Sequence, residues 1–129
     1  MKKIKRFHLA IAASMMVAML FSAPANAASS VTGNVGGVNV HGSTSISARS
    51  ATGTTICYSG GDLYVHTTFN YGYGDETKSV SAVASNVTTQ ISATATASEN
   101  VPSNIVAKGA YSTHSVTYNG AYWSASTNV

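Results

Sequence analysis

The sequence predicts an all-β fold, a small antiparallel β-sandwich or barrel of about seven to eight strands that follows a cleaved signal helix. β-branched and aromatic residues dominate the chain beyond residue 27, whereas leucine occurs there only as Leu63. Apolar and polar side chains alternate with a period of two, which is typical of strands with one buried face. Glycine, asparagine and proline interrupt these segments at short intervals and indicate turns.

The first 27 residues have the three parts of a bacterial-type secretory signal peptide. Basic residues between Lys2 and Arg6 form a positive start, and an almost wholly apolar run follows from Phe7 to Phe21. Ala25-Asn26-Ala27 is a small-residue cleavage site. A membrane span needs roughly 20 apolar residues, so this run is too short for an anchor. We therefore expect residues 1–27 to be removed from a protein that is secreted, either extracellular or in the cell envelope.

Removal of the signal peptide leaves a single domain, residues 28–129, with almost no net charge. It keeps three basic residues (Arg49, Lys78 and Lys108) against four acidic ones (Asp62, Asp75, Glu76 and Glu99), a net charge of −1. Nucleic-acid binding requires a basic face, and binding to anionic membranes requires lysine and arginine clusters. The sequence therefore predicts neither partner, and it predicts no transmembrane segment after residue 27.

Residues 28–53 are rich in glycine, serine and threonine, and two structures fit them. Weak strands fit at Gly37–His41 and Ser43–Arg49. Five glycines in this stretch weaken strand propensity, so a flexible arm ahead of a core of residues 54–129 fits nearly as well.

The segment from Leu63 to Tyr71 alternates clearly and predicts a half-buried strand. Gly60-Gly61 before it is a candidate two-residue hairpin turn, which would pair Tyr58 with Leu63. That register places Cys57 on the outer face, although free cysteine is usually buried. Since one cysteine cannot form an internal disulfide, Cys57 is either a buried small hydrophobe or a free thiol that pairs between two copies of the chain.

Glycines and charges predict a loop at Tyr71-Gly72-Tyr73-Gly74-Asp75-Glu76. Loops on rigid scaffolds often carry function. Tyr71, Tyr73, Asp75 and Glu76 are therefore candidate ligand residues, with rings suited to stacking on a sugar or contacting a protein. The alternative is that one tyrosine covers the end of the barrel.

Two further strands are predicted at Thr77–Ala84 and Val87–Ser98, and another at about residues 105–110. The second of these has threonines and serines, such as Thr94 and Thr96, along one whole side. A regular hydroxyl array could order water, as ice-binding sheets do, or pack against another chain. Because a single strand is not an array, we interpret this side as a solvated polar face.

Asn119-Gly120 is the strongest hairpin signal in the chain, because a type I′ turn needs positive φ at both positions. Pairing about this turn sets Val116 against Trp123 and His114 against Ala125. One face of the hairpin is then apolar and the other is rich in hydroxyl groups. Trp123 is the expected centre of the core.

No residue pattern predicts catalysis, a metal site or a cofactor. His41, His66 and His114 lack the spacing of a zinc motif, and we expect His66 to point outward and His114 inward. Asp75 and Glu76 are adjacent and would diverge, which makes them a poor acid–base pair. The chain also lacks the G-x-S-x-G motif of serine hydrolases. We therefore expect a protein that is not an enzyme.

Two short segments resemble secreted bacteriocins. Tyr71-Gly72-Tyr73-Gly74 is similar to their aromatic-glycine start, although the Y-G-N-G-V box and paired cysteines of the pediocin type are missing. Thr113-His114-Ser115-Val116-Thr117 resembles a short stretch of lactococcin-type bacteriocins, in a chain of different length. The resemblance implies an antimicrobial or toxin-like function.

The sequence favours a non-catalytic function in binding, adhesion or structure at the cell surface, with a protein or a carbohydrate as partner. Copies of the chain could also associate through sheet edges or Cys57. A secreted antimicrobial is the second hypothesis, and a small secreted hydrolase is the third.

Overall fold

The computed structural model describes residues 27–87, 90–100 and 104–129, and the expected signal peptide lies outside them except for Ala27. The described residues form eight strands and no helix, which confirms the predicted all-β fold. The strands are β1 (Ala28–Val35), β2 (Val38–Ile46), β3 (Ser50–Cys57), β4 (Asp62–Tyr73), β5 (Glu76–Asn86), β6 (Ser92–Ser98), β7 (Ile105–Tyr118) and β8 (Ala121–Asn128).

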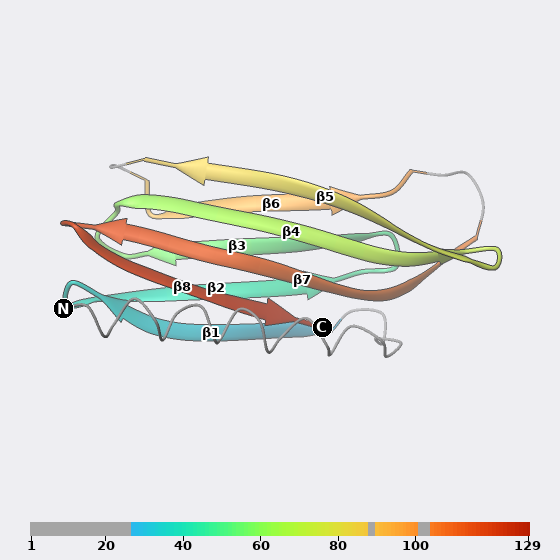
Figure 1. Ribbon diagram of the computed structural model, residues 1–129, viewed down its shortest axis with the longest axis horizontal. Helices are drawn as coiled ribbons and strands as arrows, with labels where there is room; N and C mark the ends of the chain where they lie inside the picture. Colours follow the sequence, from blue (N-terminus) through green and yellow to red (C-terminus); the bar gives the residue numbers. More distant parts are fainter. Residues whose placement is uncertain (1–26, 88–89, 101–103) are drawn as a thin grey trace.

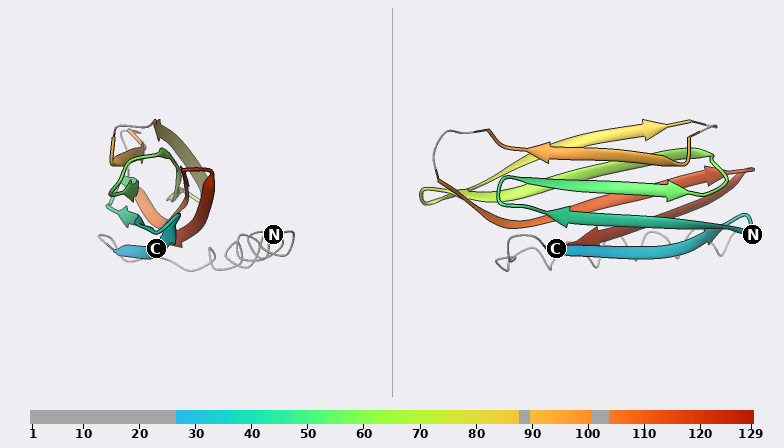
Figure 2. Two further views of the ribbon diagram at one scale, coloured as in Figure 1. Left: turned by 90° about the vertical axis from the view of Figure 1, so that its left-hand side faces the viewer. Right: turned by 180° about the vertical axis from the view of Figure 1, so that it is seen from behind.

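Two four-stranded sheets face each other as a sandwich (Figure 1). Sheet A has the strand order β1-β2-β3-β6 and sheet B has the order β5-β4-β7-β8, with every neighbouring pair antiparallel. Viewed along the strands, the sheets curve around one shared interior (Figure 2, left). The chain passes from one sheet to the other after β3, after β5 and after β6.

Residues 28–53 lie in sheet A and do not form a separate arm. β1 and β2 make a hairpin about Gly36-Gly37, both of which have positive φ. β2 runs through Gly42 without a break, because Gly42 pairs with Val31 on one side and Thr55 on the other. The two short strands predicted here are therefore one longer strand, preceded by β1.

Gly60-Gly61 does not form the predicted hairpin, because β3 and β4 belong to different sheets. With φ of 80° and 111°, these glycines lie in the connection that leads from sheet A to sheet B. Cys57 and Leu63 consequently both point into the interior, and Tyr58 is exposed. Of the two alternatives for Cys57, the structure shows the buried small hydrophobe, and the conflict that the hairpin register raised for this residue disappears with the hairpin.

The loop predicted at Tyr71–Glu76 is also wrong, because β4 continues to Tyr73 and β5 begins at Glu76. Only Gly74 and Asp75 form the turn. The strand predicted at Val87–Ser98 is too long, since β5 ends in sheet B at Asn86 and β6 begins in sheet A at Ser92. Residues 88 and 89 of that prediction lie outside the described residues.

The strand expected at residues 105–110 and the first half of the last hairpin form one continuous strand, β7. Its register against β4 shifts between Asn70 and Tyr71, which leaves Lys108 as the extra residue of a β-bulge. The hairpin itself is as predicted, with Val116 opposite Trp123 and His114 opposite Ala125. Asn119 and Gly120 have φ of 47° and 76°, as a type I′ turn requires.

Two apolar clusters fill the interior, with a layer of buried polar side chains between them. The first comprises Val35, Val40, Cys57, Leu63, Val65, Ala93, Ala95 and Val116. The second comprises Ile46, Ala51, Phe69, Tyr71, Ala97 and Ala110. The polar layer comprises Thr44, Thr55, Thr67, Ser112, His114 and Thr127. Each central strand contributes to both clusters and to the layer between them.

Trp123 is not the centre of the core, contrary to the prediction. It is half-buried on β8 and packs against the first apolar cluster. A side chain on Gly33 of β1 would overlap the Trp123 ring, so this glycine lets the ring fill the gap between the two edge strands. Phe69 and Leu63 are the largest fully buried apolar side chains.

Close packing of the sheets predicts that Gly42→Ala destabilises the fold by about 2 kcal/mol, because overpacking forces side chains to shift. A Cβ at this position would lie 2.7 Å from the His114 ring. The matched control is Ser43→Ala, on the outer face of the same strand, which should change stability by no more than about 0.5 kcal/mol. Urea unfolding of both variants measures the difference, and equal stability would contradict the packing described here.

Candidate functional site

The structure separates the four residues that the sequence analysis proposed as ligand residues. Tyr73, Asp75 and Glu76 are exposed at the β4–β5 hairpin. Tyr71 is only 4% exposed and lies in the second apolar cluster, so it does not reach a ligand at the hairpin tip. Glu76 is bound to Lys78 at 3.3 Å, and the Lys78 ammonium lies 5.3 Å from the centre of the Tyr73 ring.

Tyr71 fixes the end of the sandwich from inside. Its ring stacks on Phe69, with centroids 5.7 Å apart, and its hydroxyl donates a 2.8 Å hydrogen bond to Glu99 Oε2. The hydrogen bond to Glu99 raises the pKa of Tyr71, and desolvation and the charge of that carboxylate act in the same direction. The alternative interpretation from the sequence, a tyrosine that covers the barrel end, describes this residue.

The three histidines of the domain do not converge. His41 lies on the outer face of sheet A, His66 on the outer face of sheet B, and His114 inside, where it is 1% exposed. Among the described residues, no three histidine, cysteine, aspartate or glutamate side chains are close enough to hold a metal ion.

His114 belongs to a buried network that joins the two sheets. Its Nδ1 lies 2.8 Å from Thr55 Oγ1 in sheet A, and its Nε2 lies 2.8 Å from Thr127 Oγ1 in sheet B. Thr55 Oγ1 donates to the carbonyl oxygen of Tyr64, and Thr127 Oγ1 contacts Thr44 Oγ1. No buried side-chain nitrogen or oxygen of the described residues lacks a partner.

The direction of each hydrogen bond in this network follows from proton counting. Because the only proton of Thr55 Oγ1 goes to the Tyr64 carbonyl, Thr55 must accept from Nδ1–H of His114. Burial lowers the pKa of His114 to about 4, with a smaller contribution from His41, so the ring is neutral and Nε2 is an acceptor. Thr127 therefore donates to Nε2 and accepts from Thr44. The ring is fully occupied and enclosed, which leaves it without the free nitrogen that a general base needs.

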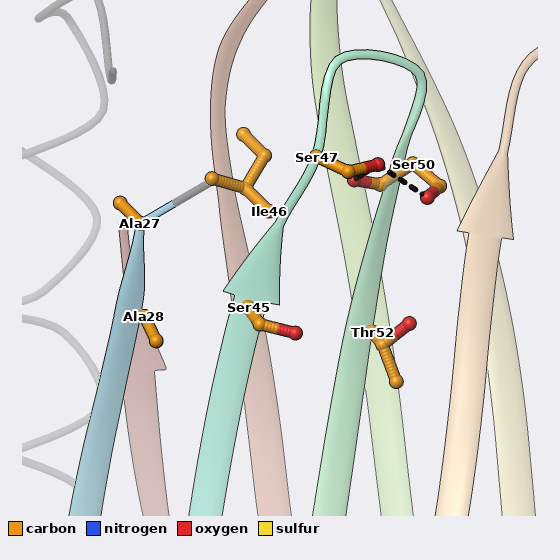
Figure 3. Close-up of a pocket in the computed structure, with 7 residues that line it drawn as sticks. All are labelled: Ala27, Ala28, Ser45, Ile46, Ser47, Ser50 and Thr52. Atoms are coloured by element: carbon orange, nitrogen blue, oxygen red, sulfur yellow. Dashed lines mark hydrogen bonds between the residues drawn. The ribbon is translucent and has the colours of Figure 1, made fainter. Parts of the chain in front are cut away.

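A shallow depression of about 350 Å³ lies at the end of sheet A where β1 and β3 begin and β2 ends (Figure 3). Hydroxyl and methyl groups line it, with Ser47 and Ser50 hydrogen-bonded to each other at 2.8 Å. The lining contains no acid, base or histidine. Its residues are Ala27, Ala28, Ser45, Ile46, Ser47, Ser50 and Thr52.

Charged residues are concentrated at one end of the sandwich. The β2–β3 turn, the β4–β5 hairpin, the end of β6 and the start of β7 meet there (Figure 1). These segments carry Arg49, Asp75, Glu76, Lys78, Glu99 and Lys108. Asp62, at the first position of β4, lies at the opposite end. The middle of both outer sheet faces is consequently left without charge.

The outer face of sheet B combines tyrosines with hydroxyl groups. Residues that pair side by side across the four strands form rows on this face. The three central rows contain no aspartate, glutamate, lysine or arginine. The rows are Ser85-Tyr64-Ser115-Ser124, Val83-His66-Thr113-Ser126 and Ser81-Thr68-Tyr111-Asn128. Tyr122 stands in the next row, opposite Thr117. Tyr64 is 39% exposed and Tyr122 is 58% exposed, so both rings are accessible from solvent.

Strand geometry places Tyr64 and Tyr122 roughly 12 Å apart, two strands across and one row along. The hydroxyl groups of Ser115, Thr117 and Ser124 lie on the strands between and beside them. Tyrosine rings and hydroxyl groups that share one face of a sheet can stack on sugar rings and form hydrogen bonds with sugar hydroxyls. We call this surface the tyrosine face.

Sequence reasoning did not propose Tyr64 or Tyr122 as site residues. The signal was nevertheless present, because both occupy the outward parity of strands whose inward parity was correctly predicted. The candidate ligand residues were placed on a predicted loop, whereas the accessible tyrosines of this face project from strands.

The chain matches no family model, and no curated protein or solved structure was found to be similar to it. Within the part of the chain that the structure describes, no helix has the length and apolar character needed to cross a membrane.

The buried neutral state of His114 predicts that stability falls as the solution is acidified from pH 6.5 to pH 4. In this window the unfolded histidine binds a proton that the folded one does not, so the free energy of unfolding decreases by about 1.4 kcal/mol per pH unit and about 3 kcal/mol in total. Urea unfolding at several pH values and the NMR titration of the His114 ring measure this.

The control for this pH dependence is His114→Asn, which has no titrating ring. It should be less stable at neutral pH but should lose the part of the acid sensitivity that arises from position 114. An NMR midpoint for His114 near pH 6.5, or the same pH dependence in both proteins, would contradict the assignment.

Burial of Cys57 predicts that its thiol is unreactive in the folded protein. Cys57 is fully buried in the first apolar cluster, so an intermolecular disulfide requires the chain to open. A chromogenic thiol reagent should detect no thiol in native protein and one per chain after denaturation in the same buffer. Rapid reaction of the native protein, or a disulfide-linked dimer on a non-reducing gel, would show that the thiol is accessible.

Proposed function

We propose that this protein is a secreted, non-catalytic binding domain that attaches to neutral polysaccharide at a cell surface through the tyrosine face. The observation that carries the proposal is the composition of that face, which combines exposed tyrosines with hydroxyl groups and whose three central rows contain no aspartate, glutamate, lysine or arginine, Asp62 standing at its edge in the row of Tyr122. A solvated sheet face that contacts nothing normally carries charged side chains, which keep proteins soluble and separate.

The chemistry of the face fits a neutral sugar better than a charged ligand. Tyrosine rings contact the C–H surface of a sugar and keep their hydroxyl groups in water. Ser115, Ser124 and Thr113 supply donors and acceptors on the same surface. No lysine or arginine stands in the central rows to bind a phosphate, a sulfate or a carboxylate.

The interior of the domain supports a non-catalytic function. His114 is the histidine with a strongly shifted pKa, and all of its hydrogen-bonding capacity is used by Thr55 and Thr127. At the hairpin, Glu76 is neutralised by Lys78 instead of being paired with a second carboxylate across a cleft. Such surroundings suit a structural histidine and a solvated ion pair, not an acid–base pair.

The proposal predicts that Tyr64→Ala and Tyr122→Ala each weaken binding to an insoluble neutral polysaccharide by about tenfold, because loss of one stacking ring costs about 1.4 kcal/mol. Depletion of the purified protein by cellulose and by chitin measures the affinity. The matched control is Tyr58→Ala, which removes a 65% exposed tyrosine from the β3–β4 connection. Unchanged depletion by the Tyr64→Ala/Tyr122→Ala double variant would refute the tyrosine face as the binding site.

A further inference from the structure

The outer face of sheet A is a two-dimensional array of hydroxyl groups. Its three central rows run across all four strands, and nine of the twelve side chains carry a hydroxyl. The rows are Ala28-Ser45-Thr52-Thr96, Ser30-Ser43-Thr54-Thr94 and Thr32-His41-Ile56-Ser92. The single-strand pattern that the sequence showed at Thr94 and Thr96 is thus extended across β3, β2 and β1. We call this surface the hydroxyl face, and the view from behind shows sheet A in front (Figure 2, right).

Hydrogen bonds between strands hold part of the array in register. Thr52 Oγ1 lies 3.0 Å from Thr96 Oγ1, and Thr54 Oγ1 lies 3.1 Å from Thr94 Oγ1. Threonine has few allowed rotamers, so these bonds fix both the hydroxyl and the methyl group of each side chain. In Figure 3, Ser45 and Thr52 stand side by side on adjacent strands of the same face.

The array repeats in both directions. Neighbouring strands are about 4.8 Å apart, and residues that point to the same side of one strand are about 6.8 Å apart. Both spacings are close to the repeats of the water lattice on the prism plane of hexagonal ice. A single polysaccharide chain repeats in one direction only, so a binding surface need match its spacing only along that direction. The surface of a crystal repeats in two directions, and a protein surface binds it best when its own groups match both spacings.

The lack of charge on this face also fits a surface of water molecules. Among its twelve side chains only His41 is titratable, and the nearest charged segments are at the end of the sandwich. A single hydroxyl contributes little when it exchanges one water partner for another. An ordered array gains more, because its groups hold many water molecules at lattice positions at the same time.

We propose that the hydroxyl face binds the surface of ice. Thr54 and Thr94 form its centre, the adjoining serines and threonines extend it, and the threonine methyl groups occupy the spaces between anchored waters. This inference is independent of polysaccharide binding, because the tyrosine face lies on the other sheet and shares no residue with the hydroxyl face.

The test is whether the purified protein enters growing ice and separates the melting and freezing temperatures of a single ice crystal. Wild-type protein should do both, and Thr94→Lys should lose both, because a long charged side chain then stands in the middle of the array. Thr94→Val, which keeps the branched shape and removes the hydroxyl, should weaken both. The matched control is Ser85→Lys, which places the same charge at an exposed position on the outer face of sheet B and should keep wild-type activity.

Exclusion of the wild-type protein from ice would overturn the proposal, and so would full activity in Thr94→Lys. Circular dichroism of each variant shows that loss of activity is not loss of fold. Microcrystalline cellulose provides the other outcome: if Thr94→Lys abolishes adsorption to cellulose and wild-type protein ignores ice, the hydroxyl face recognises a polysaccharide crystal instead. Tyr64→Ala should leave ice binding unchanged, which keeps the two proposals distinguishable.

Discussion

The buried hydrogen-bond network of His114, Thr55, Thr127 and Thr44 constrains the rest of the sandwich. The imidazole donates to Thr55 of sheet A and accepts from Thr127 of sheet B, and Thr44 completes the chain of hydroxyl groups. Hydrogen bonds have directional requirements that apolar contacts lack, so this network fixes how one sheet is placed against the other. It needs Gly42 opposite the ring, because any side chain there would occupy the space of the imidazole. It also divides the apolar interior into two clusters that pack on either side of it.

Amino-acid composition alone does not reveal which residues form this core, because the buried network places polar side chains at its centre. The domain has one leucine, and much of its buried surface comes from alanine, valine and threonine. Small side chains let the sheets approach closely, and close approach is what allows hydroxyl groups of facing strands to reach one another. Thr67 and Ser112, 2.9 Å apart, form a pair within sheet B, on the neighbouring strands β4 and β7, and Gly53 of the facing sheet leaves room for their hydroxyl groups. A threonine is therefore an inward residue on β2, β3, β4 and β8 of this chain, and an outward one at Thr52, Thr54, Thr94 and Thr96.

The sequence predicted side-chain parity well for β4, β7 and β8 and wrongly for β3, and it predicted the path of the chain less well. Asn119-Gly120 and Gly60-Gly61 carry similar turn signals, and all four residues have positive φ. The first pair closes a hairpin in sheet B, whereas the second pair lies where the chain leaves one sheet for the other. Local backbone preference cannot distinguish these outcomes, because the choice depends on which strands cover the interior. Cys57 was the one local indication, since its usual burial contradicted the hairpin. The sequence alternation also predicted that Tyr64 and Tyr122 point outward. That the two tyrosines share one face could not be predicted, because it depends on β4 and β8 both pairing with β7.

The uneven distribution of charge explains why the central rows of both outer faces lack aspartate, glutamate, lysine and arginine. With a net charge of −1 and its ionised groups gathered mainly at one end, the domain exposes mainly hydroxyl groups along its sides and charged groups at that end. A hydroxyl surface remains well hydrated without charge, so it can meet a neutral solid without first releasing counterions or stripping water from ions. The two sides then differ in one respect, which is the presence of aromatic rings. In the two proposals, the tyrosine rings of sheet B supply contact area for the C–H surfaces of sugars, whereas the central rows of sheet A, which have no tyrosine, present a regular array of hydroxyl groups to ordered water.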